Sequence, residues 1–491
     1  MMRRLFLLFL FWNLVSLFPK KSWGQVSFHD ARVDKYGQLE QVLGNKWNSI
    51  DSLIIHGPIN KADFTTMWKC AFEGNLSALN LEFARVENNK IPDYALYNPN
   101  KQWVNDGEYK SPIYTKVKNI ILPNEVTEIG SFAFTQMKLE KINFPRSLTK
   151  FNEGSFMGCH WLNVDPLIIP EGITEIPFSC FAHCQNFKKL VLPSTLKTID
   201  GFAFYNTRME CINFPEILDS IGIAAFQGSG ELKAIYLPNS LTKIGAGVFA
   251  LNDSLKEIHI SSKITRIPNR FVAYSNSVKK VIIPESVIEI GNSSFQFCTK
   301  LTHILFPSGL RIIRANAFQN CALDSIVFPA TVGYIEGGAF SNLHYLQKVY
   351  SLSETPPVCT EHPAGINPGK GPFHGFTPND IPVYVPIGSG EKYRQAFGWS
   401  YFTNIIETDK FPTGIETHLS NNTGKYSIYG KDGTLHVKAD GNGNHDPVTV
   451  HVYGIGGTPI WKGRINNHAE IRLPKGFYVV RTGKTTRKIS L

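Results

Sequence analysis

The chain has 491 residues, of which 43% are hydrophobic and 18% are charged, and its formal net charge is +10. A chain of this length exceeds what one hydrophobic core usually organises, so several domains or a repeat array are expected. Lys and Arg are scattered rather than gathered into a basic stripe, which argues against nucleic acid as a partner.

The N-terminus is typical of an export signal. Arg3 and Arg4 precede an apolar run over residues 5–18. This run is shorter than the roughly 20 residues that span a bilayer, and no later stretch is long and apolar enough to do so. We therefore expect a signal peptide over residues 1–24, an extracellular or outer-surface location, and no membrane span once the signal is removed. The alternative is that the same run remains as a membrane anchor.

Residues 25–116 lack the repeat that follows them but carry related fragments. Residues 53–57 and 76–83 have the composition of strands, and residues 59–72 suit a helix between them. Because an open end of a repeat array exposes its core, we expect this segment to be a divergent N-terminal cap.

Residues 117–345 repeat one pattern of about 23 residues ten times. A period of this length indicates a solenoid, in which short units stack and together bury a core that none could bury alone. A proline keeps the same period in nine of the units. Each unit ends in an Ala-Phe or similar pair, and the phenylalanines are Phe134, Phe156, Phe181, Phe204, Phe226, Phe249, Phe271, Phe295, Phe318 and Phe340.

Within each unit, the first segment alternates apolar and variable residues, which is the period of a strand with one buried face. In one copy the buried pair is Ile235 and Leu237, and Pro238 ends the strand because it has no N–H to donate to the next unit. Stacking should place the phenylalanines in one buried ladder. A second apolar pair follows, and glycine often comes after it, which predicts a tight or left-handed turn at Gly130, Gly222, Gly245 and Gly291.

Four of the eight cysteines share one position of the repeat, three residues after the phenylalanine. Buried thiols that fill one position of the stack explain this spacing. Disulfides between adjacent units are the alternative, because an exported chain meets an oxidising environment. The four are Cys159, Cys184, Cys298 and Cys321.

The strand residue between the two buried ones should point outward, and in most units it is apolar. Exposed apolar area of this extent usually marks an interaction site. The alternative is that β-branched residues simply favour strands, or that neighbouring segments cover them. The candidate binding residues, on what we expect to be a concave sheet face, are Ile121, Ile168, Val191, Tyr236, His259, Ile282, Leu305 and Val327.

The repeated phrases Ile-x-Leu/Phe-Pro, Leu-Thr-x-Ile-Gly and Ala-Phe-x-x-Cys resemble the BspA-type (treponemal-type) leucine-rich repeat of bacterial surface proteins. The resemblance implies a right-handed, strand-dominated solenoid of α/β type with about ten 23-residue coils and a cap at each end. It also implies adhesion to host or bacterial proteins, for example extracellular-matrix components. Residues 346–410 resemble the C-terminal cap of such arrays, with Tyr393 and Trp399 among the matching residues.

Residues 413–491 change character, with short alternating runs separated by glycines, which predicts a small β-sandwich. The end of this segment, including residues 454–457 and 473–480, resembles the C-terminal sorting domains of type IX secretion. Such a domain would be an export and surface-attachment address. The alternatives are an adhesion-type β-domain and a simple end cap.

No catalytic, metal-binding or phosphate-binding motif is apparent in the sequence, so we expect no enzyme activity, no metal and no cofactor. His160 and His183 lie near cysteines of the repeat, where packing explains them better than a metal pair does. Asp-Ser-Leu/Ile tripeptides resemble a bacterial O-glycosylation sequon, although the polar position of the repeat explains them better. Their serines are Ser52, Ser220, Ser254 and Ser325.

The sequence therefore predicts a non-catalytic secreted or cell-surface protein. Its expected partner is a protein ligand, either an extracellular-matrix component or a bacterial surface protein. A surface glycan-binding protein is the alternative.

Overall fold

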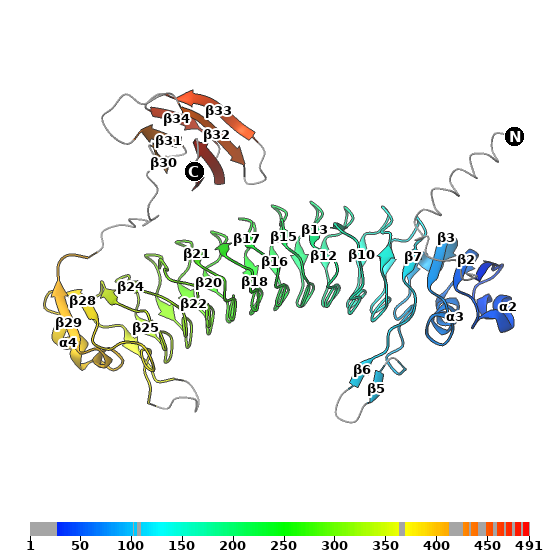
Figure 1. Ribbon diagram of the computed structural model, residues 1–491, viewed down its shortest axis with the longest axis horizontal. Coiled ribbons are helices and arrows are strands. Elements are labelled where there is room, and N and C mark those ends of the chain that lie inside the picture. Colours follow the sequence, from blue (N-terminus) through cyan, green and yellow to red (C-terminus); the bar gives the residue numbers. More distant parts are fainter. Residues whose placement is uncertain are drawn as a thin grey trace. The chain divides into compact units, whose positions relative to one another are not determined.

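The structure is a computed structural model that describes residues 27–101, 103–105, 110–362 and 369–411, and the strands of a C-terminal unit. The signal peptide expected over residues 1–24 lies outside the described residues. The chain divides into two compact units, Met1–Phe411 and Pro412–Leu491. Figure 1 shows the first unit as a gently curved stack of coils.

The N-terminal part of the first unit contains β1 (Phe28–Arg32), α2 (Leu39–Leu43), β2 (Ser52–Ile59), α3 (Lys61–Phe72), β3 (Ala78–Val86), β4 (Lys90–Ile91) and a hairpin of β5 (Trp103–Asn105) and β6 (Lys110–Pro112). Helix α3 begins with a capping box between Asn60 and Asp63. The buried Asp63 carboxylate also accepts hydrogen bonds from the backbone N–H groups of Gly37 and Leu39, both at 2.8 Å. These bonds fix the chain before α2 against the start of α3.

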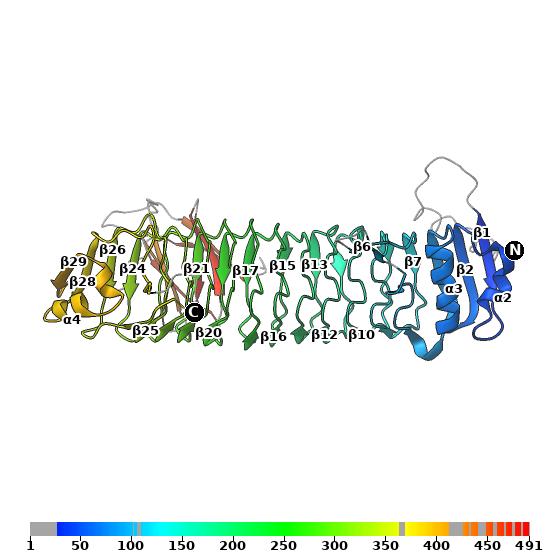
Figure 2. The ribbon, with the colours of Figure 1, turned by 90° about the horizontal axis from the view of Figure 1, so that it is seen from below.

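The first side of the stack is a row of short parallel strands with their apolar residues buried, one in every coil except that of residues 303–306, where the described chain forms no strand. These strands are β7 (Asn119–Ile121), β9 (Lys141–Ile142), β11 (Leu167–Ile168), β13 (Lys189–Val191), β15 (Cys211–Ile212), β17 (Ala234–Tyr236), β19 (Glu257–His259), β21 (Lys280–Ile282) and β24 (Ser325–Phe328). Figure 2 shows the coils lying side by side along the stack. The strand-dominated solenoid predicted from the repeat is confirmed.

The second side is another row of two-residue parallel strands, and in each of the ten coils the strand ends on the second member of the repeat's second apolar pair, such as Ile129 or Ile199. These strands are β8 (Glu128–Ile129), β10 (Lys150–Phe151), β12 (Glu175–Ile176), β14 (Thr198–Ile199), β16 (Ser220–Ile221), β18 (Lys243–Ile244), β20 (Arg266–Ile267), β22 (Glu289–Ile290), β23 (Ile312–Ile313), β25 (Tyr334–Ile335) and β27 (Val358–Cys359). Paired residues in adjacent coils occupy the same repeat position, for example Ile199 beside Ile221.

The third side carries the phenylalanines and was not predicted as a regular element. Two left-handed residues four positions apart recur in each of the ten coils, from Phe132 and Gln136 to Gly338 and Asn342. Backbone hydrogen bonds still join neighbouring coils here, as from Phe132 N–H to the Glu153 carbonyl at 2.9 Å. The ten phenylalanines are fully buried, and consecutive ring centroids along the row lie between 5.1 and 6.2 Å apart. The predicted ladder is therefore confirmed.

The four cysteines of the repeat are buried and free. Each thiol lies near a backbone carbonyl of the preceding coil, as Cys159 Sγ does at 3.0 Å from the Phe134 oxygen. Ser275 fills the corresponding place in its coil with a hydroxyl donor to the Phe249 carbonyl. Burial raises the pKa of the Cys159 and Cys298 thiols to about 12. Packed thiols, rather than disulfides, occupy this position in the structure.

The repeated glycines require a correction. Gly130, Gly222, Gly245 and Gly291 are not among the described residues with left-handed backbone angles. A Cβ at Gly222 would lie 2.3 Å from the Gly201 nitrogen, and one at Gly245 would lie 2.3 Å from the Ile223 nitrogen. These glycines are needed because adjacent coils approach too closely for a side chain, not because the turn is left-handed.

The parallel ladders continue beyond the ten coils, so the expected coil number is too low. Strands β1, β2 and β3 join the sheet of β7 and β9, while β26 (Lys348–Ser351), β28 (Pro382–Pro386) and β29 (Asn404–Thr408) extend the sheet of β24. After β28, α4 (Gly390–Gln395) and a 3-10 turn cover the end of the core. Buried Tyr393 and Trp399 pack edge to face at 5.0 Å there and end the aromatic ladder.

The second unit consists of two antiparallel sheets with one shared core. One sheet has β30 (Tyr426–Lys431), β31 (Thr434–Ala439) and β34 (His468–Arg472). The other has β32 (Val448–Gly454), β33 (Pro459–Ile465), β35 (Phe477–Thr482) and β36 (Thr485–Ser490). Leu435 and Val437 of the first sheet pack in one cluster with Val450 and Val452 of the second. This is the small β-sandwich expected at the C-terminus.

Candidate binding surface

The candidate surface is the outward row of residues on the first strand of each coil, which we call the first-strand row. Of the eight predicted residues, the most exposed are Ile168 at 56%, Leu305 at 51%, Val191 at 46% and Ile282 at 42%. Ile121, Tyr236, His259 and Val327 are half-buried. All eight side chains are thus at least partly accessible, as expected. That their sheet forms the concave side of the solenoid stays a prediction.

The strand register brings some of these residues into lateral contact, along two stretches of sheet. Ile168 pairs with Val191 across β11 and β13. Tyr236, His259 and Ile282 are consecutive partners across β17, β19 and β21. Leu305 lies between strands rather than in one. The row is therefore broken into segments and is not one continuous ladder.

The Tyr236 segment combines an aromatic platform with fixed charge. The Tyr236 and His259 rings stack with centroids 4.7 Å apart. His259 Nε2 lies 2.7 Å from Glu257 Oε1, and Lys280 Nζ lies 3.7 Å from the same carboxylate oxygen. This segment can therefore offer both apolar contact and charged hydrogen bonding to a ligand.

The sequence analysis missed an aromatic extension of the row. Val327, Tyr350, Tyr384 and Ile406 are consecutive register partners across β24, β26, β28 and β29. The Tyr350 and Tyr384 rings stack with centroids 4.7 Å apart. Both tyrosines lie after the ten counted repeats, so periodicity alone did not place them. The available signal was the Tyr in Val349-Tyr350 and Val383-Tyr384, each beside a buried valine.

Not every outward residue is free for binding. In the second coil, the Asn143 side chain accepts a hydrogen bond from Leu122 N–H at 2.7 Å and donates one to the Leu122 carbonyl at 3.2 Å. The amide thus extends the contact between these two coils beyond the residues that pair in β7 and β9. This separates Ile121 from the exposed Ile168–Val191 pair.

Charged residues border the row at the entry to the first strand. Glu210 lies 3.0 Å from both Lys188 and Lys233, and Lys118 lies 3.0 Å from Glu140. Hydrogen bonds from Lys188 and Lys233 lower the pKa of Glu210 to about 2. Glu210 therefore stays ionised at neutral pH, and rearranging these exposed ion pairs when a ligand binds costs little free energy.

A second aromatic group, which we call the aromatic cluster, lies outside the row. It brings Tyr114 and Trp161 into edge-to-face contact at 5.0 Å, with Trp161 39% exposed. His160 and His183, the two histidines near cysteines of the repeat, belong to this cluster, and their ring centroids lie 6.1 Å apart. The chain of ring contacts continues through Tyr205 and Phe202 to Phe178.

The serines of the sequon-like tripeptides are poorly placed for modification. Ser52 is only 6% exposed, and Ser220, Ser254 and Ser325 are half-buried. The Ser325 hydroxyl donates to its neighbour Asp324 at 2.8 Å. Ser220, Ser254 and Ser325 precede a first strand or a second strand of the repeat, or lie at its start, and that the repeat rather than a modification explains these serines stays a prediction.

The parallel coils, the stacked apolar core and the accessible row on one strand define a leucine-rich repeat solenoid. The family model of the BspA type leucine rich repeat region matches the chain in six copies, over residues 110–231, 160–279 and 271–355. Together these ranges cover half of the 491 residues. The chain belongs to the BspA-type leucine-rich repeat family.

Solved structures of proteins from several bacteria align with this chain. A leucine-rich repeat protein from Bacteroides ovatus ATCC 8483 aligns with a TM-score of 0.51 and 21% identity, covering 68% of this chain and 88% of that one. A leucine rich cell surface protein from Faecalibacterium prausnitzii A2-165 has a TM-score of 0.34 and 21% identity, with 51% and 86% covered. The pneumococcal vaccine antigen PcpA has a TM-score of 0.37 and 16% identity, with 63% and 88% covered.

A search of curated proteins found no match to the chain. Within the described part of the chain, no helix combines the length and the apolar character that crossing a bilayer requires. The likeness to the Bacteroides ovatus protein supports the fold and says nothing of a ligand.

Proposed function

We propose that this protein is exported to the cell surface or the medium and binds a protein ligand through the first-strand row. The observation that supports this proposal is the series of accessible apolar and aromatic side chains that the strand register aligns. Tyr236, His259 and Ile282 lie at its centre. Such a surface, bordered by charged residues, has the composition of a protein interface. The function is non-catalytic, and the ligand class is an extracellular-matrix or bacterial surface protein.

The test is binding of the chain from residue 25 onward to a panel of matrix proteins, bacterial surface proteins and glycans. The row variant changes Tyr236, Ile282 and Leu305 to serine. The matched control changes Ile217, Ile223 and Ile288 to serine, since these are 47%, 50% and 47% exposed but lie outside the row. We expect the row variant to lose at least about tenfold in affinity and the control to bind as the parent does.

Two results would contradict the proposal. One is equal binding by the parent and the row variant, with both melting at the same temperature. The other is a similar loss in the control, which would mean that general surface hydrophobicity, rather than the row, carries the binding.

A glycan ligand is the second candidate, and the stacked Tyr350–Tyr384 pair is the observation that favours it. Flat aromatic faces pack against the C–H faces of sugar rings, and the expected row offered only Tyr236 for this purpose. Changing Tyr350 and Tyr384 to alanine should then abolish glycan binding and leave protein binding by the Tyr236 segment intact.

For the C-terminal unit, we propose a role as an export and surface-attachment address. Its support is the resemblance of residues 454–457 and 473–480 to type IX sorting domains. An adhesion-type β-domain and a simple end cap are the alternatives.

A further inference from the structure

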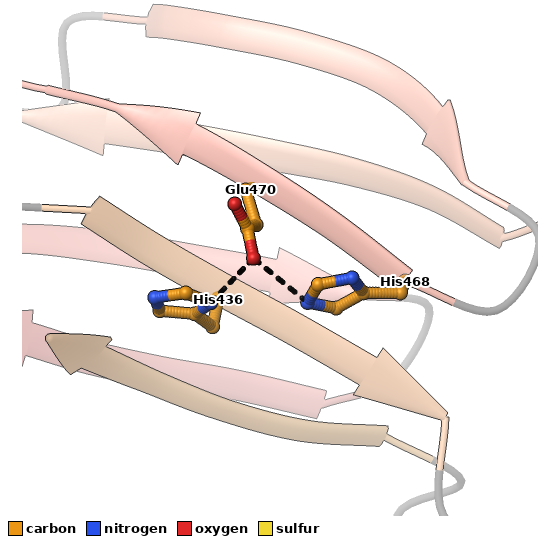
Figure 3. Close-up of side chains that lie close together, drawn as sticks. All are labelled: His436, His468 and Glu470. Atoms are coloured by element: carbon orange, nitrogen blue, oxygen red, sulfur yellow. Dashed lines mark ion pairs between the residues drawn. The ribbon is translucent and has the colours of Figure 1, made fainter.

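Three potential metal ligands meet on one face of the C-terminal unit. His436 lies on β31, and His468 and Glu470 lie on the neighbouring strand β34 (Figure 3). The antiparallel register places His436 directly opposite Glu470. The alternate residues Leu435 and Ile471 point into the core. The three side chains therefore project from the outer face of this sheet.

Their ligand atoms are close enough to share one ion. His436 Nδ1 lies 3.4 Å and His468 Nε2 lies 3.8 Å from Glu470 Oε1. All three ligand atoms lie within 4.8 Å of one another. Zinc–nitrogen and zinc–oxygen bonds of about 2.0–2.2 Å in a tetrahedron place ligands roughly 3.3–3.5 Å apart. Only small side-chain rotations are needed to reach this spacing.

The donor set selects the kind of metal. Two imidazole nitrogens and one carboxylate oxygen suit zinc and similar divalent transition metals. Calcium and magnesium prefer oxygen ligands only. The side chain of His436 is 16% exposed, whereas those of His468 and Glu470 are 45% and 60% exposed. Solvent therefore reaches the site, and a fourth position is open to water or to a ligand from another molecule.

We propose that the C-terminal unit binds one zinc ion through His436, His468 and Glu470. The ion joins β31 to β34 by bonds between side chains, in addition to the backbone ladder. This role is independent of the binding proposed for the first-strand row. The competing interpretation is that Glu470 only forms ion pairs with the two histidines.

Zinc titration of the metal-free chain from residue 25 onward tests the proposal. With zinc chloride in a calorimeter, we expect the parent to bind one zinc ion per chain. In His468→Gln and in Glu470→Gln, binding should be lost or the affinity should fall about 10- to 100-fold. Losing a ligand should weaken binding at least as much as losing a residue that supports a ligand. The matched control is His303→Gln. His303 Nδ1 lies 3.1 Å from Asp324 Oδ1, which is a histidine–carboxylate pair with no third potential ligand beside it among the described residues. We expect this variant to bind zinc as the parent does.

A local readout distinguishes the site from zinc bound elsewhere. Zinc should slow amide hydrogen exchange in β31 and β34 of the parent, and should not do so in the two ligand variants. Amide hydrogen exchange without metal shows whether the variants are folded. The visible spectrum of the parent with cobalt in place of zinc shows whether the site is tetrahedral. Unchanged zinc stoichiometry in a His468→Gln, Glu470→Gln double variant would overturn the proposal, as would no binding by the parent at about 100 μM zinc.

Discussion

Gly245 illustrates how the repeat is constrained at the level of a single residue. The neighbouring coil leaves no room for a Cβ there, because the nearest atoms would be the Ile223 nitrogen at 2.3 Å and the Gly222 carbonyl carbon at 2.4 Å. Both are backbone atoms, which cannot rotate away. Any side chain at this position must therefore push two coils apart.

We predict that Gly245→Ala lowers the free energy of unfolding by about 1–3 kcal/mol, the usual effect of overpacking. The control is Gly230→Ala, where a Cβ would meet nothing within 4 Å. Its effect should stay below about 1 kcal/mol. Urea unfolding of both variants measures the difference. Equal midpoints for the two would refute the close-approach explanation.

At the scale of elements, the coils are held together by three ladders with different chemistry. The first two are parallel strands, and the third uses pairs of left-handed residues four positions apart, with a buried phenylalanine between the two. Phe204 packs face to face with Phe181 at 5.6 Å and with Phe226 at 5.4 Å. Each coil thus depends on its two neighbours, as expected for a solenoid.

The aromatic cluster makes the stability of the solenoid depend on pH. Burial lowers the pKa of His160, and burial together with the charge of His160 lowers the pKa of His183. The unfolded chain takes up these protons near the ordinary histidine pKa of about 6.5, before the folded chain does. The two buried, neutral histidines therefore contribute fully to the free energy of unfolding above this pH, and that contribution is lost as the pH falls below it.

Replacing His160 and His183 by glutamine should flatten the change in melting temperature between about pH 7.5 and pH 5. The control is His344→Gln, which removes an exposed histidine outside the cluster. Thermal unfolding across this pH range provides the comparison. A double variant with the pH profile of the parent would show that the cluster does not titrate on unfolding.

At the scale of the whole molecule, the two units have separate hydrophobic cores. The core of the first unit runs from Ala31 to Ile405, and that of the second contains Leu435, Val437 and their neighbours. The described residues of one core are not members of the other. The solenoid should therefore fold without the C-terminal unit.

We predict that deleting residues 412–491 leaves the main unfolding transition of the solenoid unchanged. In the native host, the same deletion should abolish surface attachment if the C-terminal unit is an export and attachment address. Calorimetry and fractionation of cells measure the two effects. A large drop in the solenoid's melting temperature would contradict the first expectation, and retained attachment would contradict the second.

The repeat made most of the solenoid predictable. Phe134 to Phe340, the buried strand pairs and the cysteine position all follow from periodicity, because stacked coils place equivalent residues over one another. The left-handed third side was not predicted, since residues as different as Phe132, Arg270 and Gly338 adopt it. Backbone hydrogen bonding between coils, rather than local preference, imposes that conformation.

For the sites, the sequence by itself determined which residues face outward along the first strand, because the alternation of a strand is local. Only the tertiary structure decided which of them meet. Tyr350 reaches Tyr384 through a connection of more than 30 residues, and His436 reaches Glu470 through the register of an antiparallel pair. Such contacts depend on which distant strands pair and in which register. Local patterns in the sequence do not reveal that register.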